Sequence, residues 1–345
     1  MNTSPNKKSK FWRKQKWIKI IIIFIIFLLL LVISGFVFEW IASKNSSSKY
    51  PPPGKMVDIG GYRLHIHKQG TGSPIILLES GSGESSLSWR NIPTTLSKSA
   101  TVVSYDRAGY AWSDESPLPR TGDNIVKELH TALDQANIKG PYILVGHSLG
   151  GMYSRLFAQK YQNEVAGIVL IDARPENDAN RTEPIYQKEK PKSNPSPLFS
   201  ILLKESGAFR LFPNFLLTGR VEKEDRKDFV HIVASSKYFR AVAEEGDLAT
   251  STENEIRNQK LGDIPVRVIA RGQEQDLTKF GISQQANDLI EQSWQLGQRE
   301  MLNISINSQF IIAKQSEHMI IHTEPDLVVK VIEELIKNIK LTQNK

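Results

Sequence analysis

Residues 142–151 read YILVGHSLGG, and this stretch decides the fold. A short apolar run of strand length leads into Gly146-His147-Ser148-Leu149-Gly150, and the helical pattern GMYSRLFAQKY follows. A G-x-S-x-G sequence is a weak signal alone, but its strand–turn–helix context predicts a strained turn that lifts Ser148 Oγ out of the sheet edge. The flanking glycines leave room for neighbouring backbone. The stretch therefore indicates a nucleophilic serine; the alternative is a structural serine in a glycine-bounded turn.

Further apolar runs of strand length lie before and after this stretch. They are continuous rather than alternating, as expected for strands that are covered on both faces. Helical patterns, such as 125–133 and 327–339, accompany them. This alternation predicts an α/β fold with a mostly parallel sheet flanked by helices, preceded by two short strands around the glycine pair 60–61. The runs are 75–78, 101–105, 142–145, 166–171, 266–270 and 310–313.

One segment, 174–259, does not follow this alternation. It contains no convincing strand, begins with a polar stretch that carries prolines, and continues into helical-looking pieces. We interpret it as a helical cap inserted over the active edge of the sheet, within a body that spans residues 56–340. No internal repeat is visible.

An apolar segment near the N-terminus predicts a membrane-spanning helix. Residues 20–38 carry no charge, and at about 1.5 Å per residue they cover roughly 28 Å of the ~30 Å hydrocarbon layer. The basic tail 1–19 precedes the span, so the positive-inside rule predicts a cytoplasmic N-terminus, a single-pass protein of the cell membrane and an extracytoplasmic catalytic body. A cleaved signal peptide is the alternative, but the run exceeds the usual ~7–15 residues, and Trp40 occupies a position where cleavage after Ala42 needs a small residue. Residues 43–55, rich in serine and proline, are interpreted as a linker.

The charge of the chain is concentrated in this N-terminal part. The net charge is +7, yet residues 1–55 hold ten Lys and Arg against one Glu, and residues 56–345 hold 34 basic against 36 acidic groups. A basic nucleic-acid-binding body is therefore excluded, because the positive charge belongs to the anchoring segment. There is no cysteine, which excludes a disulfide framework and a thiol nucleophile.

A serine nucleophile needs a base, and the position in the chain selects one of the seven histidines. His318 follows the last predicted strand, QFIIAK, and precedes the final helix, 170 residues after Ser148. His322 is a rival that also fits the start of that helix. His65 and His67 share an early strand, where a two-histidine metal site is less typical than solvated side chains. We interpret the remaining three, His130, His147 and His231, as structural.

The acid that orients the base should lie at the C-terminal edge of a strand, between Ser148 and His318 in the chain. Asp276 follows the predicted strand 266–270 by a short loop and is the leading candidate. Asp172, directly after GIVLI, is its main competitor, with a local turn cap as its structural alternative. Glu274 is the third candidate.

At these residues the sequence resembles the α/β-hydrolase superfamily (AB hydrolase-1 type), in particular its esterase and peptidase-like branch with a lid. The resemblance covers nearly all of residues 58–339, and His318 stands seven residues before Pro325, as the catalytic histidine of that family commonly does. It implies a Ser-His-acid hydrolase with two oxyanion donors. Beyond GHSLGG, it rests on SYDRAGYAWSD (104–114), EVAGIVLIDA (164–173) and SEHMIIHTEPDLVVKVIEEL (316–335).

The oxyanion donors come from two places. The helix N-terminus behind the serine offers the Leu149 N–H. The resemblance adds the loop after the third strand, where the family usually has His-Gly and this chain has ESGSG (79–83); carried over to this loop, the donor is the Ser82 N–H. Asp106 and Arg107 are expected to brace this region. Asp276 lies one residue further from Gly272 than in the common family form, which keeps Asp172 open as the acid.

These features together predict a membrane-anchored serine hydrolase that uses no metal or organic cofactor. Its expected substrate is a small acyl compound, with carboxylic esters favoured over amides because nothing visible binds a peptide terminus. An amidase or peptidase of the same fold is one alternative. Another, of a different class, is an inactive hydrolase-fold protein that presents its cap to a partner. The sequence leaves the oligomeric state open.

Overall fold

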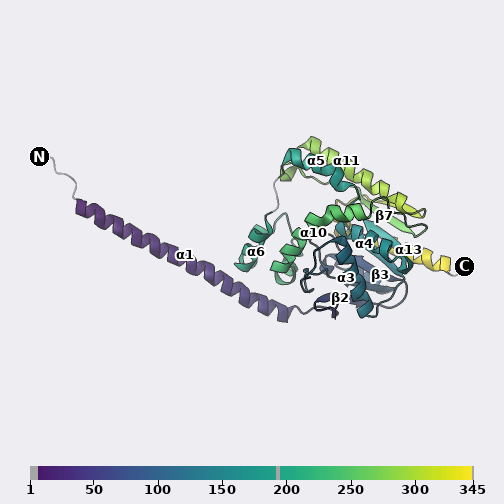
Figure 1. Cartoon of the computed structure of the whole chain (residues 1–345), viewed down its shortest axis with the longest axis horizontal. Coiled ribbons are helices and arrows are strands. Elements are labelled where there is room, and N and C mark those ends of the chain that lie inside the picture. Colours follow the sequence, from purple (N-terminus) through teal and green to yellow (C-terminus); the bar gives the residue numbers. More distant parts are fainter. Residues whose placement is uncertain (1–6, 192–194, 344–345) are drawn as a thin grey trace. The chain divides into compact units, whose positions relative to one another are not determined.

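The computed structural model describes residues 7–191 and 195–343 of the chain (Figure 1). It divides into two compact units. The smaller unit consists of the chain up to Pro51 together with Leu198–Ser236, and the larger unit consists of Pro52–Pro197 and the chain from Lys237 onward.

An eight-stranded sheet forms the centre of the larger unit, with the order β1-β2-β4-β3-β5-β6-β7-β8. β2 pairs antiparallel with both β1 and β4, and every other pairing is parallel. Each strand expected from the sequence is present. The strands are β1 Lys55–Asp58, β2 Arg63–Gln69, β3 Ile75–Glu79, β4 Thr101–Tyr105, β5 Tyr142–His147, β6 Val165–Ile171, β7 Val266–Arg271 and β8 Ser308–Ala313.

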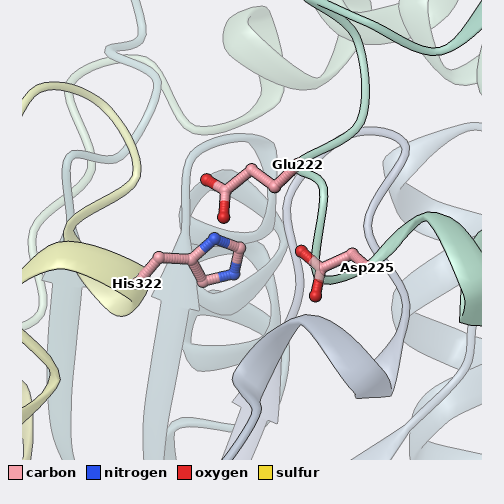
Figure 2. Close-up of side chains that lie close together, drawn as sticks. All are labelled: Glu222, Asp225 and His322. Carbon is pink, nitrogen blue, oxygen red and sulfur yellow. The ribbon is translucent and has the colours of Figure 1, made fainter. Parts of the chain in front are cut away.

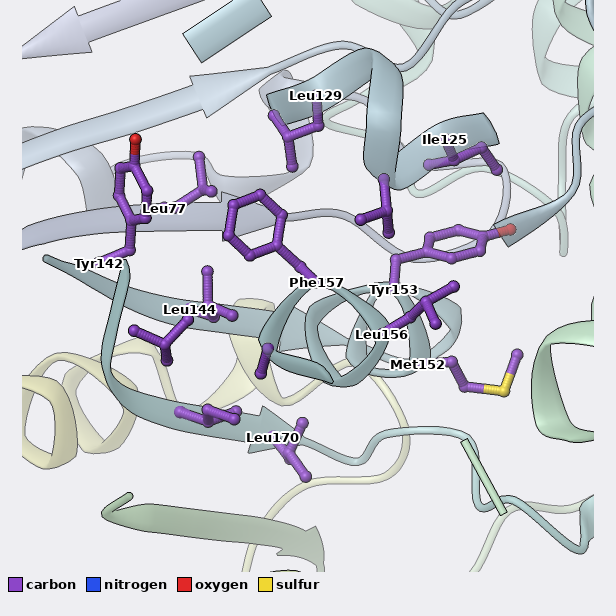
Figure 3. Close-up of a cluster of buried hydrophobic side chains, with 14 of the residues drawn as sticks. Leu77, Ile125, Leu129, Tyr142, Leu144, Met152, Tyr153, Leu156, Phe157 and Leu170 are labelled. Carbon is purple, nitrogen blue, oxygen red and sulfur yellow. The ribbon is translucent and has the colours of Figure 1, made fainter. Parts of the chain in front are cut away.

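Alternate residues of the central strands feed two hydrophobic cores, one on each face of the sheet. Leu77 and Leu144 pack in one core with α3 (Gly122–Gln135) and α4 (Leu149–Lys160), as Figure 3 shows for Phe157 of α4. Their neighbours in sequence enter the second core. There they meet α2 (Ile92–Leu96), α12 (Ile320–Thr323) and α13 (Pro325–Gln343). Because both faces are covered, the strands read as continuous apolar runs.

The remaining helices of the larger unit connect these elements. The chain between β6 and β7 contains only helices in its described part, and the structure divides it between the two units. The larger unit keeps α5 Asp178–Glu189 and nearly all of α10 Ser236–Glu255. It also contains α11 Gln284–Glu300 and the short 3-10 helices η1 Ser86–Trp89, η2 Gln162–Glu164, η4 Thr278–Phe280 and η5 Met301–Ile304.

The smaller unit joins the N-terminal helix to the middle of the predicted cap. Its elements are α1 Lys7–Lys49, α6 Pro197–Glu205, α7 Ala208–Leu211, α8 Pro213–Leu216, α9 Arg226–Asp228 and the π-helical turn η3 Phe229–Val233. In the described residues, α1 is the one helix long and apolar enough to cross a membrane. Within it, the large apolar side chains of residues 20–38 are 39–66% exposed, as a lipid-facing segment requires.

The structure corrects the predicted linker, because α1 continues through most of it. Glu39 is buried and pairs with Arg210 Nε at 2.7 Å, while Ser43 Oγ donates to Glu39 Oε1 at 2.7 Å. Ser46 Oγ lies 3.1 Å from Arg210 Nη1, which donates to it. Ser43 and Ser46 of the predicted linker therefore have side-chain partners within a continuous helix.

Candidate active site

The turn between β5 and α4 places Ser148 at the C-terminal edge of the sheet, as predicted. Ser148 has a left-handed backbone, with φ 51° and ψ −122°, and precedes the first residue of α4. Its N–H donates to Ile171 O at 3.1 Å, and its carbonyl accepts from Gly151 N–H at 3.0 Å. Such a conformation is strained for a residue with a Cβ, so it persists only where the surroundings hold it.

Two glycines make this turn possible because other backbone passes close to them. A Cβ on Gly146 would lie 2.6 Å from Gly150 O, and a Cβ on Gly150 would collide with the carbonyl oxygens of Glu79 and Ser80. The loop after β3 therefore lies directly against the start of α4. The two segments expected to supply oxyanion donors are neighbours.

His318 meets Asp172 in the structure. The distance from His318 Nδ1 to Asp172 Oδ2 is 2.6 Å, and the histidine side chain is 24% exposed while the aspartate is fully buried. An ionised carboxylate only accepts hydrogen bonds, so Nδ1 carries the proton and Nε2 of the neutral ring is left as a base. Asp172 has a left-handed backbone (φ 39°) directly after β6.

Asp172 is held as a carboxylate by several donors. Arg271 Nη1 donates to Oδ2 at 2.8 Å, Trp294 Nε1 donates to Oδ1 at 2.9 Å, and the Arg271 N–H is 3.3 Å from Oδ1. Burial alone would raise its pKa, but the hydrogen bond and charge of His318, followed by Arg271 and Trp294, hold the pKa of Asp172 well below its usual value. The group therefore stays ionised near neutral pH.

The expectation that Asp276 orients the base is not met. Asp276 is exposed, and its Oδ1 accepts from the N–H and Oγ1 of Thr278 at 2.9 and 2.5 Å. Glu274 is exposed as well. The physical reason is the residue at the end of β7. Arg271 pairs with Asp172 and with Glu291 (Nη2 to Oε2, 2.6 Å). The strand that was expected to lead to the acid therefore supplies the cation that pairs with it.

A second pair, formed by the buried His147 and the partly buried Glu84, lies beside the serine and was not expected from the sequence. His147 Nδ1 faces Glu84 Oε2 at 2.9 Å, and its Nε2 faces His318 O at 3.0 Å. Because both ring nitrogens face acceptors, the ring donates from both and is an imidazolium. Burial would lower the pKa of His147, but the Glu84 carboxylate raises it above its usual value. The pair ties the β3 loop to the backbone of His318.

Arg107 fixes the loop after β3. Its Nη1 donates to Ser80 O at 2.6 Å and to Glu79 Oε1 at 2.9 Å, and its Nη2 donates to Gly81 O at 2.7 Å. Glu245 of α10 accepts from Arg107 Nε at 3.0 Å, so two buried carboxylates share this cation. Burial raises the pKa of Glu79 to about 7 against the opposing effect of Arg107. The predicted bracing role of Arg107 is confirmed, and the unusual Glu79 belongs to that brace.

The backbone N–H groups of Ser82 and Leu149, the two predicted oxyanion donors, lack the hydrogen bonds that the N–H groups of Gly81 and Gly83 make in the described part of the chain. The Gly81 N–H donates to Glu84 Oε2 at 3.0 Å, and the Gly83 N–H lies 3.4 Å from the Tyr110 hydroxyl. Between them, the N–H of Ser82 makes no hydrogen bond within the described part of the chain, and that of Leu149 makes none there either. Both N–H groups therefore remain available to an external acceptor.

Most of the other histidines are held in structural contacts. His65 is fully buried against Asp106 (Nδ1 to Oδ2, 2.8 Å), which corrects the interpretation of a solvated strand residue. His322 of α12, drawn in Figure 2, donates from Nε2 to Ser88 O at 2.9 Å. His130 Nε2 contacts Glu164 at 3.0 Å.

Sequence reasoning missed Arg271, Trp294 and Glu84. The one visible signal was Arg271, a charged residue that continues a buried strand without a break, because such a residue needs a buried partner. Trp294 and Glu84 reach the site from a helix and a loop that no motif linked to Ser148.

Comparison with known proteins agrees with this architecture. Residues 74–325 match the family model described as alpha/beta hydrolase fold. The uncharacterized protein YqjL of Bacillus subtilis (strain 168) is 29% identical over 275 residues, 79% of this chain and 88% of its own. A thermophilic esterase from Thermogutta terrifontis superimposes with a TM-score of 0.56 at 18% identity, covering 82% of this chain and 97% of its own. An epoxide hydrolase does so with a TM-score of 0.57 at 17% identity, with the same coverage of 82% and 97%. The chain therefore belongs to the alpha/beta hydrolase family.

Proposed function

We propose that this protein is a membrane-anchored serine hydrolase that cleaves carboxylic esters of small acyl substrates. The observation that carries the proposal is the contact of His318 Nδ1 with the buried Asp172 carboxylate, next in the fold to a strained serine at the start of α4. A histidine oriented in this way keeps Nε2 unprotonated and basic. The site thus has the residue types that acyl transfer requires.

In the proposed reaction, Ser148 Oγ attacks the carbonyl carbon while His318 Nε2 takes its proton. The oxyanion that forms accepts hydrogen bonds from the N–H groups of Leu149 and Ser82. His318 then gives the proton to the leaving alcohol, and an acyl-enzyme remains. Water, deprotonated by the same nitrogen, releases the acid and restores the serine.

Asp172 stabilises the imidazolium that forms in each step. Because Arg271 and Trp294 already compensate its charge, it orients the ring without taking the proton itself.

The membrane part of the proposal rests on α1. Its exposed apolar length matches a bilayer, and the cations that precede it support a cytoplasmic N-terminus and an extracytoplasmic larger unit.

Labelling with a fluorophosphonate probe tests the nucleophile. The full chain in detergent micelles should label covalently, and Ser148→Ala should not. Ser99→Ala is the matched control, because Ser99 is an exposed serine just before β4, at the opposite edge of the sheet, and its variant should label like the wild type. Equal labelling of Ser148→Ala and wild type would refute the assignment.

Turnover of a short-chain p-nitrophenyl ester and of the matching anilide separates the substrate classes. The ester should be cleaved faster than the anilide. A reversed preference would contradict ester hydrolysis, and labelling of Ser148 without turnover of either compound would contradict an enzymatic role.

A further inference from the structure

A cationic pocket lies within the smaller unit, between the C-terminal part of α1 and the segment from α7 to η3. Its volume is about 850 Å³. Five cationic side chains line it, and Asp and Glu are absent from its lining among the described residues. The five are Lys49, Arg210, Lys223, Arg226 and Lys227, and they define the cationic pocket.

Most of this charge is not compensated inside the protein. Arg210 pairs with the buried Glu39 at 2.7 Å. Arg226 donates only to neutral acceptors, Asn214 Oδ1 at 2.9 Å and a backbone carbonyl, and the three lysines make no ion pair within the described residues. Four positive charges around one cavity repel one another, so the pocket favours an anion.

The cationic side chains of the pocket also act on His231. Its Nδ1 accepts from Arg210 Nη1 at 2.7 Å. Burial lowers the pKa of His231 first, the charges of Arg210, Lys49 and Lys227 lower it further, and Asp228 opposes them. The ring is therefore neutral and adds no charge to the pocket.

The pocket begins at the depth where the membrane span ends. Phe38, the last residue of the apolar stretch, and Tyr50 both line the pocket. These residues are about 18 Å apart along the helix at 1.5 Å per residue, whereas a headgroup layer is roughly 5–8 Å thick on each side of the bilayer. The lining residues of α1 therefore span a length of helix that starts at the end of the apolar stretch and exceeds the thickness of a headgroup layer.

The neighbouring turn of the smaller unit supports this depth. A Cβ on Gly35, inside the apolar stretch, would lie 2.6 Å from Ser206 O, so the turn after α6 touches α1 at its lipid-facing end. Around this turn, large apolar side chains are exposed, including Phe212 at 60% and Phe215 at 85%. Exposed aromatic residues next to an apolar helix are typical of an interface with lipid.

We propose that the cationic pocket binds the phosphate of an anionic phospholipid from the leaflet that it faces. The uncompensated Lys49, Lys223, Arg226 and Lys227 receive the phosphodiester, and the apolar wall formed by Phe38, Pro213 and Val230 receives the first part of the acyl chains. A soluble phosphate shares the charge but has no use for the apolar wall or for the depth of the pocket. The inference is independent of the hydrolase reaction.

Binding of short-chain lipids to the full chain in neutral detergent tests this proposal. Dihexanoyl phosphatidylglycerol should bind saturably, while dihexanoyl phosphatidylcholine and inorganic phosphate should bind at least tenfold more weakly. The double variant Lys223→Gln/Lys227→Gln should lose about 30-fold in affinity for phosphatidylglycerol, since each cation near lipid contributes roughly a fivefold effect.

The matched control is Lys44→Gln/Arg220→Gln, which removes the same charge from the same unit at exposed positions outside the pocket lining. It should bind like the wild type, and both double variants should keep the wild-type unfolding temperature. Equal affinity of the two double variants would overturn the assignment to the pocket. Equal binding of inorganic phosphate and phosphatidylglycerol would overturn the lipid as ligand.

Discussion

At the scale of single residues, Asp172 is the common hydrogen-bond acceptor of the candidate site. One buried carboxylate accepts hydrogen bonds from His318, Arg271 and Trp294. Removing its charge leaves Arg271 buried and partly unpaired, which costs several kcal/mol of folding free energy. It also allows the His318 ring to adopt the tautomer with the proton on Nε2, which cannot act as a base. Asp172 is thus a structural and a proposed catalytic residue at once.

Exchange of the two aspartates distinguishes the candidates for the acid. Asp172→Asn should lower kcat for a p-nitrophenyl ester by about 10³–10⁴-fold. The reason is that a neutral amide no longer fixes the His318 tautomer in which Nδ1 carries the proton. Asp276→Asn removes only contacts to Thr278 and should leave kcat within about twofold. A large loss in Asp276→Asn with little loss in Asp172→Asn would reverse the assignment.

Glu79 makes a pH-dependent contribution to stability. Its pKa is about 7 in the folded protein, mainly through burial, against a usual value of 4.5. The folded state therefore holds the proton more tightly, so the contribution is complete below about pH 4.5 and is lost as the pH rises to 7. The integrated effect is of the order of 3 kcal/mol.

Glu79→Gln removes this titration and isolates it. The free energy of unfolding of the wild type minus that of the variant, from urea titrations, should fall between about pH 4.5 and 7 and stay constant above. A difference that is flat or rises over this interval would contradict the raised pKa of Glu79.

At the scale of elements, the close contact between α4 and the loop after β3 positions the proposed oxyanion site. Gly150 belongs to the first turn of α4, where any Cβ meets the carbonyl oxygens of Glu79 and Ser80. The same loop is tied down on its other side by Arg107. The loop is therefore held on both sides and cannot move away from a Cβ added at Gly150.

Gly150→Ala should consequently destabilise the protein by about 1–3 kcal/mol and lower kcat more than it changes KM, because it displaces the Ser82 N–H from the oxyanion position. Gly246→Ala in α10 is the matched control, since nothing lies within 4 Å of its added Cβ. It should be neutral or stabilise by up to about 1 kcal/mol. Thermal unfolding and ester kinetics measure both; equal behaviour of the two variants would contradict the close-contact argument.

At the scale of the whole molecule, the chain combines a helix suited to a bilayer with an alpha/beta hydrolase body. The absence of cysteine allows the topology to be tested on a clean background. In intact cells, a membrane-impermeant maleimide should label Thr71→Cys, an exposed position of the larger unit, and should not label Ser9→Cys in the basic tail. After permeabilisation both should label. Labelling of Ser9→Cys alone in intact cells would invert the proposed topology.

The sequence by itself determined the sheet, the strained serine turn, His318 as the histidine after the last strand and the apolar length of α1. Local periodicity, strand-length apolar runs or a short motif predict each of these features, so knowledge of the tertiary structure is not needed. The partner of His318 could not be predicted from the sequence, because Asp172 and Asp276 both follow strands. Only the tertiary packing of Arg271, Trp294 and His318 around Asp172 distinguishes the two.

The same limit explains the N-terminal region. The serines of residues 43–55 suggested a flexible linker, yet α1 continues to Lys49, and Arg210 and His231, more than 160 residues away in the chain, supply partners for Ser46. Such partners are brought together only by the folded chain, since a hydrogen bond between distant residues leaves no periodic trace in the sequence. Local pattern therefore decided the elements of this protein, and tertiary contact decided which of its charged residues meet.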